Sequence, residues 1–163
     1  MTAEHYDRRA TRRGFLIGAA QLAGGVGLVL ALPVNDGRAT PDTLQAAIRK
    51  ITSEAPLQKG KVKLELPAMV ENGNAVSIEV AVESPMTAAD HVKAIHILNE
   101  KNPLPNVLSV QLGPRAGKAT VATRIRLATT QQIMAVAEMS DGSFWFDTAD
   151  IFVALAACQE DPG

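Results

Sequence analysis

Residues 75–83 read AVSIEVAVE, and this stretch decides the fold class. Its apolar side chains recur at every second position from Val76 to Val82, with residues such as Ser77 and Glu79 between them. A period of two places alternate side chains on opposite faces of an extended strand. The stretch therefore predicts a β-strand with one face in a core and the other in water.

The same alternation recurs on both sides of this stretch. Turn-forming residues such as Asn72-Gly73 and Asp141-Gly142 separate the apolar runs about every 8–12 positions. The expected strands cover residues 61–66, 75–83, 91–100, 106–112, 119–128, 132–140 and 143–157. Seven short strands without intervening helices predict an all-β, antiparallel sandwich, with an immunoglobulin-like topology as the default for this size. A small barrel is the competing architecture, since periodicity alone does not separate the two.

A short helix is expected before the first strand. Thr40 is a candidate N-cap, and Pro41 suits the first helical position. Four apolar residues then share one helical face: Leu44, Ala47, Ile48 and Ile51. Residues 53–60, which end at Gly60, are interpreted as a linker between this helix and the strands.

The N-terminus has the features of an export signal. Arg12 and Arg13 precede an apolar run over residues 17–32. Gly37 and Ala39 are the small residues that a signal peptidase accepts before its cleavage point. Together these features predict a twin-arginine (Tat) signal peptide and export to the periplasm. A membrane anchor is the alternative, but a run of about 16 residues is shorter than the roughly 20 that a spanning helix needs.

The chain is therefore expected to divide into three regions. Residues 1–39 form the signal peptide, residues 40–60 the short helix and linker, and residues 61–163 the sandwich domain with its C-terminal cysteine tail. Residues 40–163 carry 11 Lys and Arg against 14 Asp and Glu, a net charge of −3. Without a basic stripe or an aromatic stacking platform, nucleic acid is not an expected partner, and no membrane association is expected after cleavage.

Cys158 is the only cysteine in the sequence, five residues before the end. An exported chain meets an oxidising compartment, where a single cysteine has no partner within its own chain. An odd cysteine in such a protein indicates either a partner thiol or a reactive group. The alternative is an inert, buried cysteine that behaves as a small hydrophobe. The residues alone leave both interpretations open.

Other chemically active groups are sparse. His91 and His96 are five positions apart on an expected strand and should point to opposite faces, which argues against a shared metal site. Each is expected to be solvated or paired across strands. Asp147 and Asp150 resemble a carboxylate pair, but a turn explains them equally well. Two methionines, Met134 and Met139, lie in core-like runs and lack the clustered soft ligands that copper needs.

No catalytic residue, metal site or cofactor is therefore expected in this chain. A reactive thiol without a base, a metal or a cofactor suits a carrier protein better than an enzyme. Partner enzymes would then supply the chemistry.

Three stretches make the sequence similar to a known family. They are KLELPAMVENGNAVSIEVAVESPMTAADHVKAIHILNEKNPLPNV (63–107), TRIRLATTQQIMAVAEMSDGSFW (123–145) and the terminal strand that ends in Cys158. On these residues the chain resembles the SoxY family, the sulfur-carrier subunits of the periplasmic thiosulfate-oxidising (Sox) system. The resemblance runs from about Lys61 to Cys158 and agrees with the Tat signal.

The resemblance implies an immunoglobulin-like fold, a SoxZ-like β protein as partner, and a C-terminal cysteine that bears the substrate covalently. A periplasmic haem enzyme would conjugate thiosulfate to that thiol. Other sulfur-processing enzymes would then release sulfate and oxidise the remaining sulfur. Cys158 is the residue that matches the carrier cysteine.

The tail departs from the family pattern of Gly-Gly-Cys-Gly-Gly. The matching residues run from Ala156 to Glu160 and read AACQE, with Asp161 next. Alanines are stiffer than glycines, and nearby carboxylates disfavour the thiolate. Two alternatives follow: a SoxY-like carrier for another periplasmic pathway, associated with a quinoprotein dehydrogenase, and a non-covalent partner subunit with an inert cysteine.

Overall fold

A computed structural model describes residues 41–155 of the 163-residue chain. The one α-helix in this range, α2, spans Pro41–Thr52. The strands are β1 (Leu57–Lys59), β2 (Val62–Glu65), β3 (Met69–Asn72), β4 (Val76–Val82), β5 (Val92–Asn99), β6 (Asn106–Gln111), β7 (Thr120–Ile125), β8 (Gln131–Met139) and β9 (Phe144–Leu155). A short 3-10 turn, η1, covers Pro114–Ala116. The predicted signal peptide lies outside the described residues.

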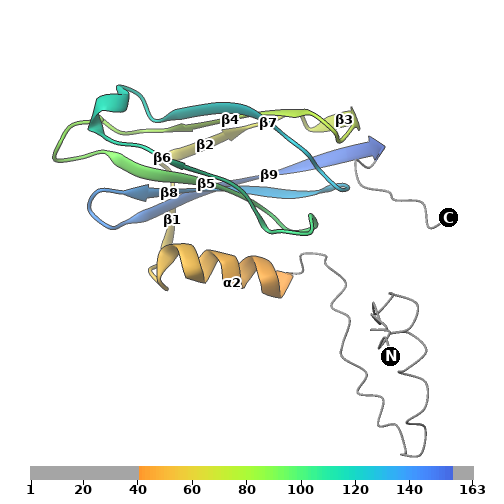
Figure 1. Cartoon of the computed structure of the whole chain (residues 1–163), viewed down its shortest axis with the longest axis horizontal. Coiled ribbons are helices and arrows are strands. Elements are labelled where there is room, and N and C mark those ends of the chain that lie inside the picture. The colour runs from red at the N-terminus through yellow and green to blue at the C-terminus, as the bar shows by residue number, and fades with distance from the viewer. Residues whose placement is uncertain (1–40, 156–163) are drawn as a thin grey trace, which may run out of the picture. The chain divides into compact units, whose positions relative to one another are not determined.

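Two sheets face each other as the layers of a sandwich (Figure 1). The larger sheet has the order β1-β9-β8-β5-β6, and β3 also pairs with β9. The smaller sheet has the order β2-β4-β7 and is antiparallel throughout. This arrangement confirms the immunoglobulin-like sandwich, and each of the seven predicted strands is present.

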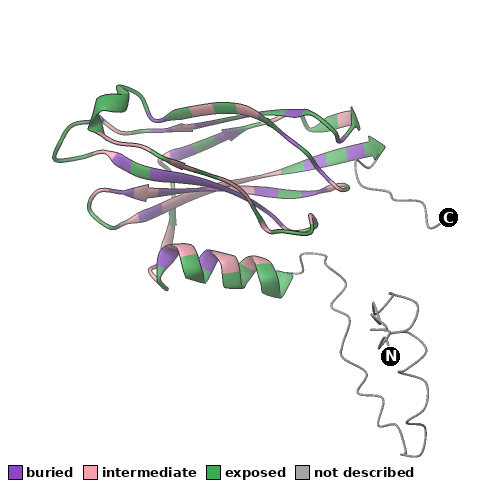
Figure 2. Cartoon of the chain, in the orientation of Figure 1, coloured by how far each residue is buried: buried purple, intermediate pink, exposed green. Residues whose placement is uncertain are grey.

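The alternation in residues 75–83 has the predicted effect. Along β4, Val76, Ile78, Val80 and Val82 are buried, and Ser77 and Glu79 are exposed. The inward-facing residues of both sheets form the main core, in which Val80, Ile97, Leu127 and Ile133 have no exposed surface. Figure 2 shows the resulting alternation of buried and exposed bands along the strands.

Two short strands lie where the sequence indicated a linker and a turn. β1 lies within residues 53–60, and β3 overlaps the Asn72-Gly73 turn signal. Both pair with β9 in parallel, in contrast to the antiparallel pairs elsewhere in the molecule. Their partner is more than 80 positions away in the sequence, so the local residue pattern carries no trace of the pairing.

Helix α2 packs on the outer face of the larger sheet, close to β1 (Figure 1). Ile48 is buried against Leu98, Val136 and Phe144, which form a second, smaller core. This contact explains why β8 is buried on both faces along part of its length. Within residues 41–155, no helix is both long enough and apolar enough to cross a membrane.

Candidate functional site at the end of the last strand

Cys158, the candidate carrier residue, lies outside the described residues, three positions after the end of β9 at Leu155. The signal residues Arg12 and Arg13 also lie outside them. The structure therefore defines the base from which the cysteine tail extends. That base is the C-terminal end of β9, which is hydrogen-bonded to β3 on one edge and to Thr130 on the other.

β3 holds one edge of this base. It pairs in parallel with β9, with Met69 opposite Phe152, Val70 opposite Val153 and Asn72 opposite Leu155. Backbone hydrogen bonds reinforce the pairing at both ends: Phe152 N–H donates to the carbonyl of Ala68 over 2.9 Å, and Gly73 N–H donates to that of Leu155 over 3.1 Å. The main chain is thus hydrogen-bonded as far as Leu155.

Thr130 holds the opposite edge, just before β8 begins. Its hydroxyl oxygen accepts a hydrogen bond from the backbone N–H of Val153 over 2.9 Å and donates one to the carbonyl of the same residue over 3.4 Å. With β3 on one side and Thr130 on the other, both edges of the strand end are hydrogen-bonded. The end of β9 is therefore a fixed base for the residues that follow.

Three exposed apolar side chains surround this base. Met69 is 67% exposed, Phe152 52% and Leu155 65%. Because Met69 and Phe152 are register partners, they lie beside each other on the outer face of the larger sheet. Leu155 alternates in phase with the buried Val153 and so lies on the opposite face of the strand. We call Met69 and Phe152 the apolar end surface. The sequence alone did not indicate Met69, because β3 was not predicted. Phe152 could have been recognised as an exposed apolar residue, because its position in the alternating pattern of β9 faces outward.

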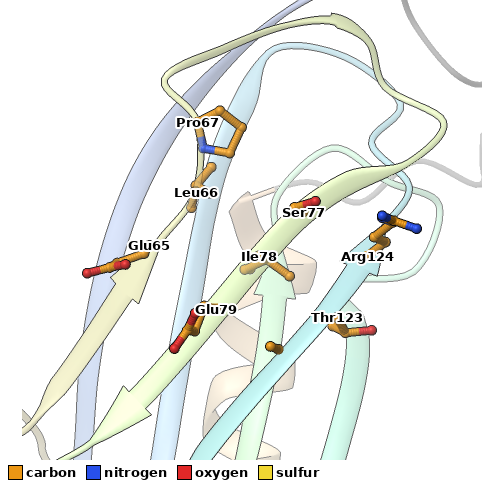
Figure 3. A pocket seen from close by; sticks show the side chains of 9 residues that line it. Glu65, Leu66, Pro67, Ser77, Ile78, Glu79, Thr123 and Arg124 are labelled. Atoms are coloured by element: carbon orange, nitrogen blue, oxygen red, sulfur yellow. The ribbon is translucent and has the colours of Figure 1, made fainter.

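A cavity of about 880 Å³ opens where the chain leaves β2 (Figure 3). Leu66 and Pro67 diverge from β4 there, and Arg124 of β7 lies across the cavity from Glu65 of β2. Glu65 forms an ion pair with Lys63. The hydrogen bond with Glu65, and then the charges of Glu65 and Glu79, raise the pKa of Lys63 above its usual value.

The two histidines lie apart, as predicted. The His96 ring is buried, and its Nδ1 is hydrogen-bonded over 2.8 Å to the hydroxyl of Ser109, its cross-strand partner on β6. His91 precedes β5, and its Nδ1 lies 3.1 Å from the carbonyl oxygen of Thr87. The cross-strand role of His96 is confirmed. Residues 41–155 contain no group of three or more His, Cys, Asp or Glu that could hold a metal ion.

The two aspartates also have separate structural roles. The prediction of a turn at these residues is wrong, because β9 is continuous from Phe144 to Leu155. The carboxylate of Asp147 accepts a hydrogen bond from the backbone N–H of Leu64 over 3.0 Å, which ties β2 to β9. Asp150 accepts one from the side chain of Gln132. Met134 and Met139 pack in the two cores, as predicted.

Fold and site together define a class: a single immunoglobulin-like sandwich whose last strand ends three residues before the chain's only thiol. The family model for the sulfur oxidation protein SoxY matches residues 48–158, which include this cysteine. The chain therefore belongs to the SoxY family.

One solved structure agrees with this assignment, and a second shares the fold. The sulfur carrier protein SoxY from Chlorobium limicola f thiosulfatophilum is 26% identical, with a TM-score of 0.59, over 69% of this chain and 96% of that one. A superoxide reductase (neelaredoxin) from Ignicoccus hospitalis is 20% identical, with a TM-score of 0.52, over 75% of this chain and 99% of that one. The second likeness concerns the fold alone. None of the curated proteins compared with the sequence matches it.

Proposed function

We propose that this protein is a covalent sulfur carrier in periplasmic thiosulfate oxidation, with Cys158 as the residue that bears the substrate. The observation that carries the proposal is the SoxY family match, which extends to Cys158 itself. The likeness to a sulfur carrier protein along nearly all of that protein's length supports it. The Tat signal expected over residues 1–39 would bring the chain to the periplasm.

The geometry of β9 suits such a role. A carrier has to present one atom to several enzymes, so its thiol should lie beyond the folded domain but remain attached to a fixed base. β9 is hydrogen-bonded up to Leu155, three residues before Cys158. Three residues span at most about 10 Å when extended. The thiol is therefore within about that distance of the base.

The proposed chemistry has two steps. In the first, the Cys158 thiol and thiosulfate form a sulfur–sulfur bond, which releases one proton and two electrons to a haem enzyme. In the second, water attacks the terminal sulfonate group, which leaves as sulfate with a proton, and a persulfide remains on Cys158. Further enzymes oxidise that sulfur. The carrier supplies only the thiol and is a substrate of its partners rather than an enzyme.

The apolar end surface supports a second part of the proposal, a stable SoxZ-like β-protein partner. Exposed apolar side chains that lie side by side usually mark an interface. Here Met69 and Phe152 lie side by side on the outer face of the larger sheet, next to the base of the tail. A partner bound there would lie beside Cys158 and would present it to the enzymes together with its own surface.

The test is the intact mass of the protein after incubation with thiosulfate and the conjugating haem enzyme. We expect a mass increase of one thiosulfate group on the wild-type chain and none on Cys158→Ser. Gln159→Ala is the matched control, because it changes the neighbouring residue and keeps the thiol. A thiosulfate adduct on the Cys158→Ser protein, or an unchanged wild-type mass, would refute the covalent role of Cys158.

A further inference from the structure

Two arginines lie at the same end of the molecule as the base of the tail. Arg124 is on β7, and Arg126 follows the end of that strand. Both residues are exposed. Within residues 41–155, neither forms an ion pair, whereas Lys63 and Lys93 each have a carboxylate partner. We call Arg124 and Arg126 the arginine pair.

Of the two carboxylates that line a cavity with Arg124, one is already paired with another cation. Glu65 and Glu79 line the same cavity as Arg124. Glu65 forms its ion pair with Lys63, and both glutamates raise the pKa of that lysine. Figure 3 shows Arg124 at the far side of the cavity from Glu65. The arginine pair therefore has positive charge available for an anionic group from elsewhere.

Two backbone hydrogen bonds relate this pair to the base of the tail. Gly73 N–H donates to the carbonyl of Leu155 over 3.1 Å, and Leu127 N–H donates to the carbonyl of Gly73 over 2.8 Å. Each such bond joins main chains about 4.8 Å apart, so Leu127 lies within about 10 Å of Leu155. Arg126, one Cα step further, lies within about 14 Å.

The tail beyond Leu155 carries two carboxylates at a suitable distance. Glu160 and Asp161 are five and six positions after Leu155. Five residues span up to about 17 Å when extended. Either carboxylate can therefore reach the arginine pair without any change in the sandwich.

We propose that the arginine pair binds the carboxylates of Glu160 and Asp161 and so docks the cysteine tail against the end of the sandwich. Docking would place positive charge near Cys158 and offset the two negative charges that otherwise disfavour its thiolate. Exposed ion pairs each shift an equilibrium by only roughly 1.5- to 5-fold. The docked and free tails would therefore both be populated, and a partner enzyme could release the thiol at little cost.

The single cysteine provides the test, because a nitroxide spin label reacts only at Cys158. We expect its electron paramagnetic resonance spectrum at low ionic strength to contain a slow and a fast component. The slow component should fall in Arg124→Gln/Arg126→Gln by roughly 2- to 25-fold relative to the fast one. It should fall in the wild type as well at about 0.5 M sodium chloride, where the Debye length is near 4 Å.

Two further variants identify the partners. Arg115→Gln, an exposed arginine on η1, is the matched control and should keep the slow component. A charge swap, Arg124→Glu/Arg126→Glu combined with Glu160→Arg/Asp161→Arg, should restore the slow component of the spectrum that the arginine changes alone remove. Identical spectra for the wild type and Arg124→Gln/Arg126→Gln would overturn the proposal, as would a charge swap that restores nothing. The measurement needs neither thiosulfate nor a partner enzyme, so its outcome is independent of the proposed carrier function.

Discussion

His96 shows how a single residue can make stability depend on pH. The residue is 8% exposed, its Nδ1 is hydrogen-bonded to Ser109, and its Nε2 is buried without a hydrogen-bond partner among the described residues. Protonation of Nε2 would create a buried positive charge that has no hydrogen-bond acceptor at this atom. Burial therefore lowers the pKa of His96 below its usual value, and the negative charge of Glu138 offsets this only in part.

The sign of the resulting effect follows from linkage. Because the folded-state pKa is depressed, the unfolded chain binds the proton more readily. The stabilising effect of neutral His96 is complete above its unfolded pKa near 6.5 and is lost as the pH falls below that value toward the folded one. We expect the free energy of unfolding of His96→Gln, measured by urea titration between about pH 7.5 and 5, to depend less on pH than that of the wild type.

His91→Gln is the control for this experiment, because His91 lies before β5 and outside the buried face. It should keep the pH dependence of the wild type. A wild-type slope that persists in His96→Gln would assign the effect to other groups. The sequence predicted the cross-strand position of His96 but not its burial, since the packing of α2 on this face was not predicted.

At the scale of elements, the turn between β1 and β2 depends on one glycine. Gly60 has a φ of +130°, a conformation that residues with a side chain rarely adopt. A Cβ at this position would meet Trp145 at 3.6 Å, which is an ordinary contact. The backbone conformation, rather than a steric clash, therefore disfavours a side chain here. This turn moves the chain from the larger sheet to the smaller one.

We predict that Gly60→Ala lowers the free energy of unfolding by about 1–3 kcal/mol. Gly113→Ala is the matched control, because Gly113 has an extended backbone with a φ of −154°, and a Cβ there would meet no atom within 4 Å. That variant should change stability by less than about 0.5 kcal/mol. Chemical denaturation of both variants checks the difference, and equal losses would show that the φ of Gly60 does not matter.

Strand prediction succeeded where a strand has its own periodic pattern and failed where it does not. Residues such as Val76 to Val82 alternate strictly, so each main strand was visible locally. β1 and β3 have three and four residues and exist because β9 pairs with them. Short parallel pairings over a long sequence separation are set by topology, which a local pattern does not record.

At the scale of the whole molecule, the apolar end surface should control assembly. We predict that Phe152→Ser weakens binding to the SoxZ-like partner by at least tenfold, because a partly buried aromatic anchor often contributes more than 2 kcal/mol to an interface. Isothermal titration calorimetry of the two purified proteins measures this change.

Leu104→Ser is the control for the partner experiment. Leu104 is 74% exposed but lies in the segment before β6, which β8 and β5 separate from β9 in the sheet order. Its replacement should leave the affinity unchanged. If Leu104→Ser weakened binding and Phe152→Ser did not, the interface would be elsewhere on the molecule.

Only part of the site could be predicted from the sequence. Counting cysteines and comparing motifs identified Cys158, since both depend on the sequence alone. The apolar end surface and the arginine pair combine residues from distant segments, such as Met69 with Phe152. They become neighbours only through the sheet order, so they required the structure.

The interior position of β9 has a consequence for the time course of folding. β9 is the last strand in the sequence, yet it pairs with β8 on one edge and with β1 and β3 on the other. Leu57 meets Phe144, which is 87 positions later. At a synthesis rate of about 5–20 residues per second, the pairing residues of β9 are synthesised roughly 4–17 s after those of β1. The larger sheet is thus completed only after translation has reached Leu155, three codons before Cys158, and the thiol is made almost together with the strand that holds its base.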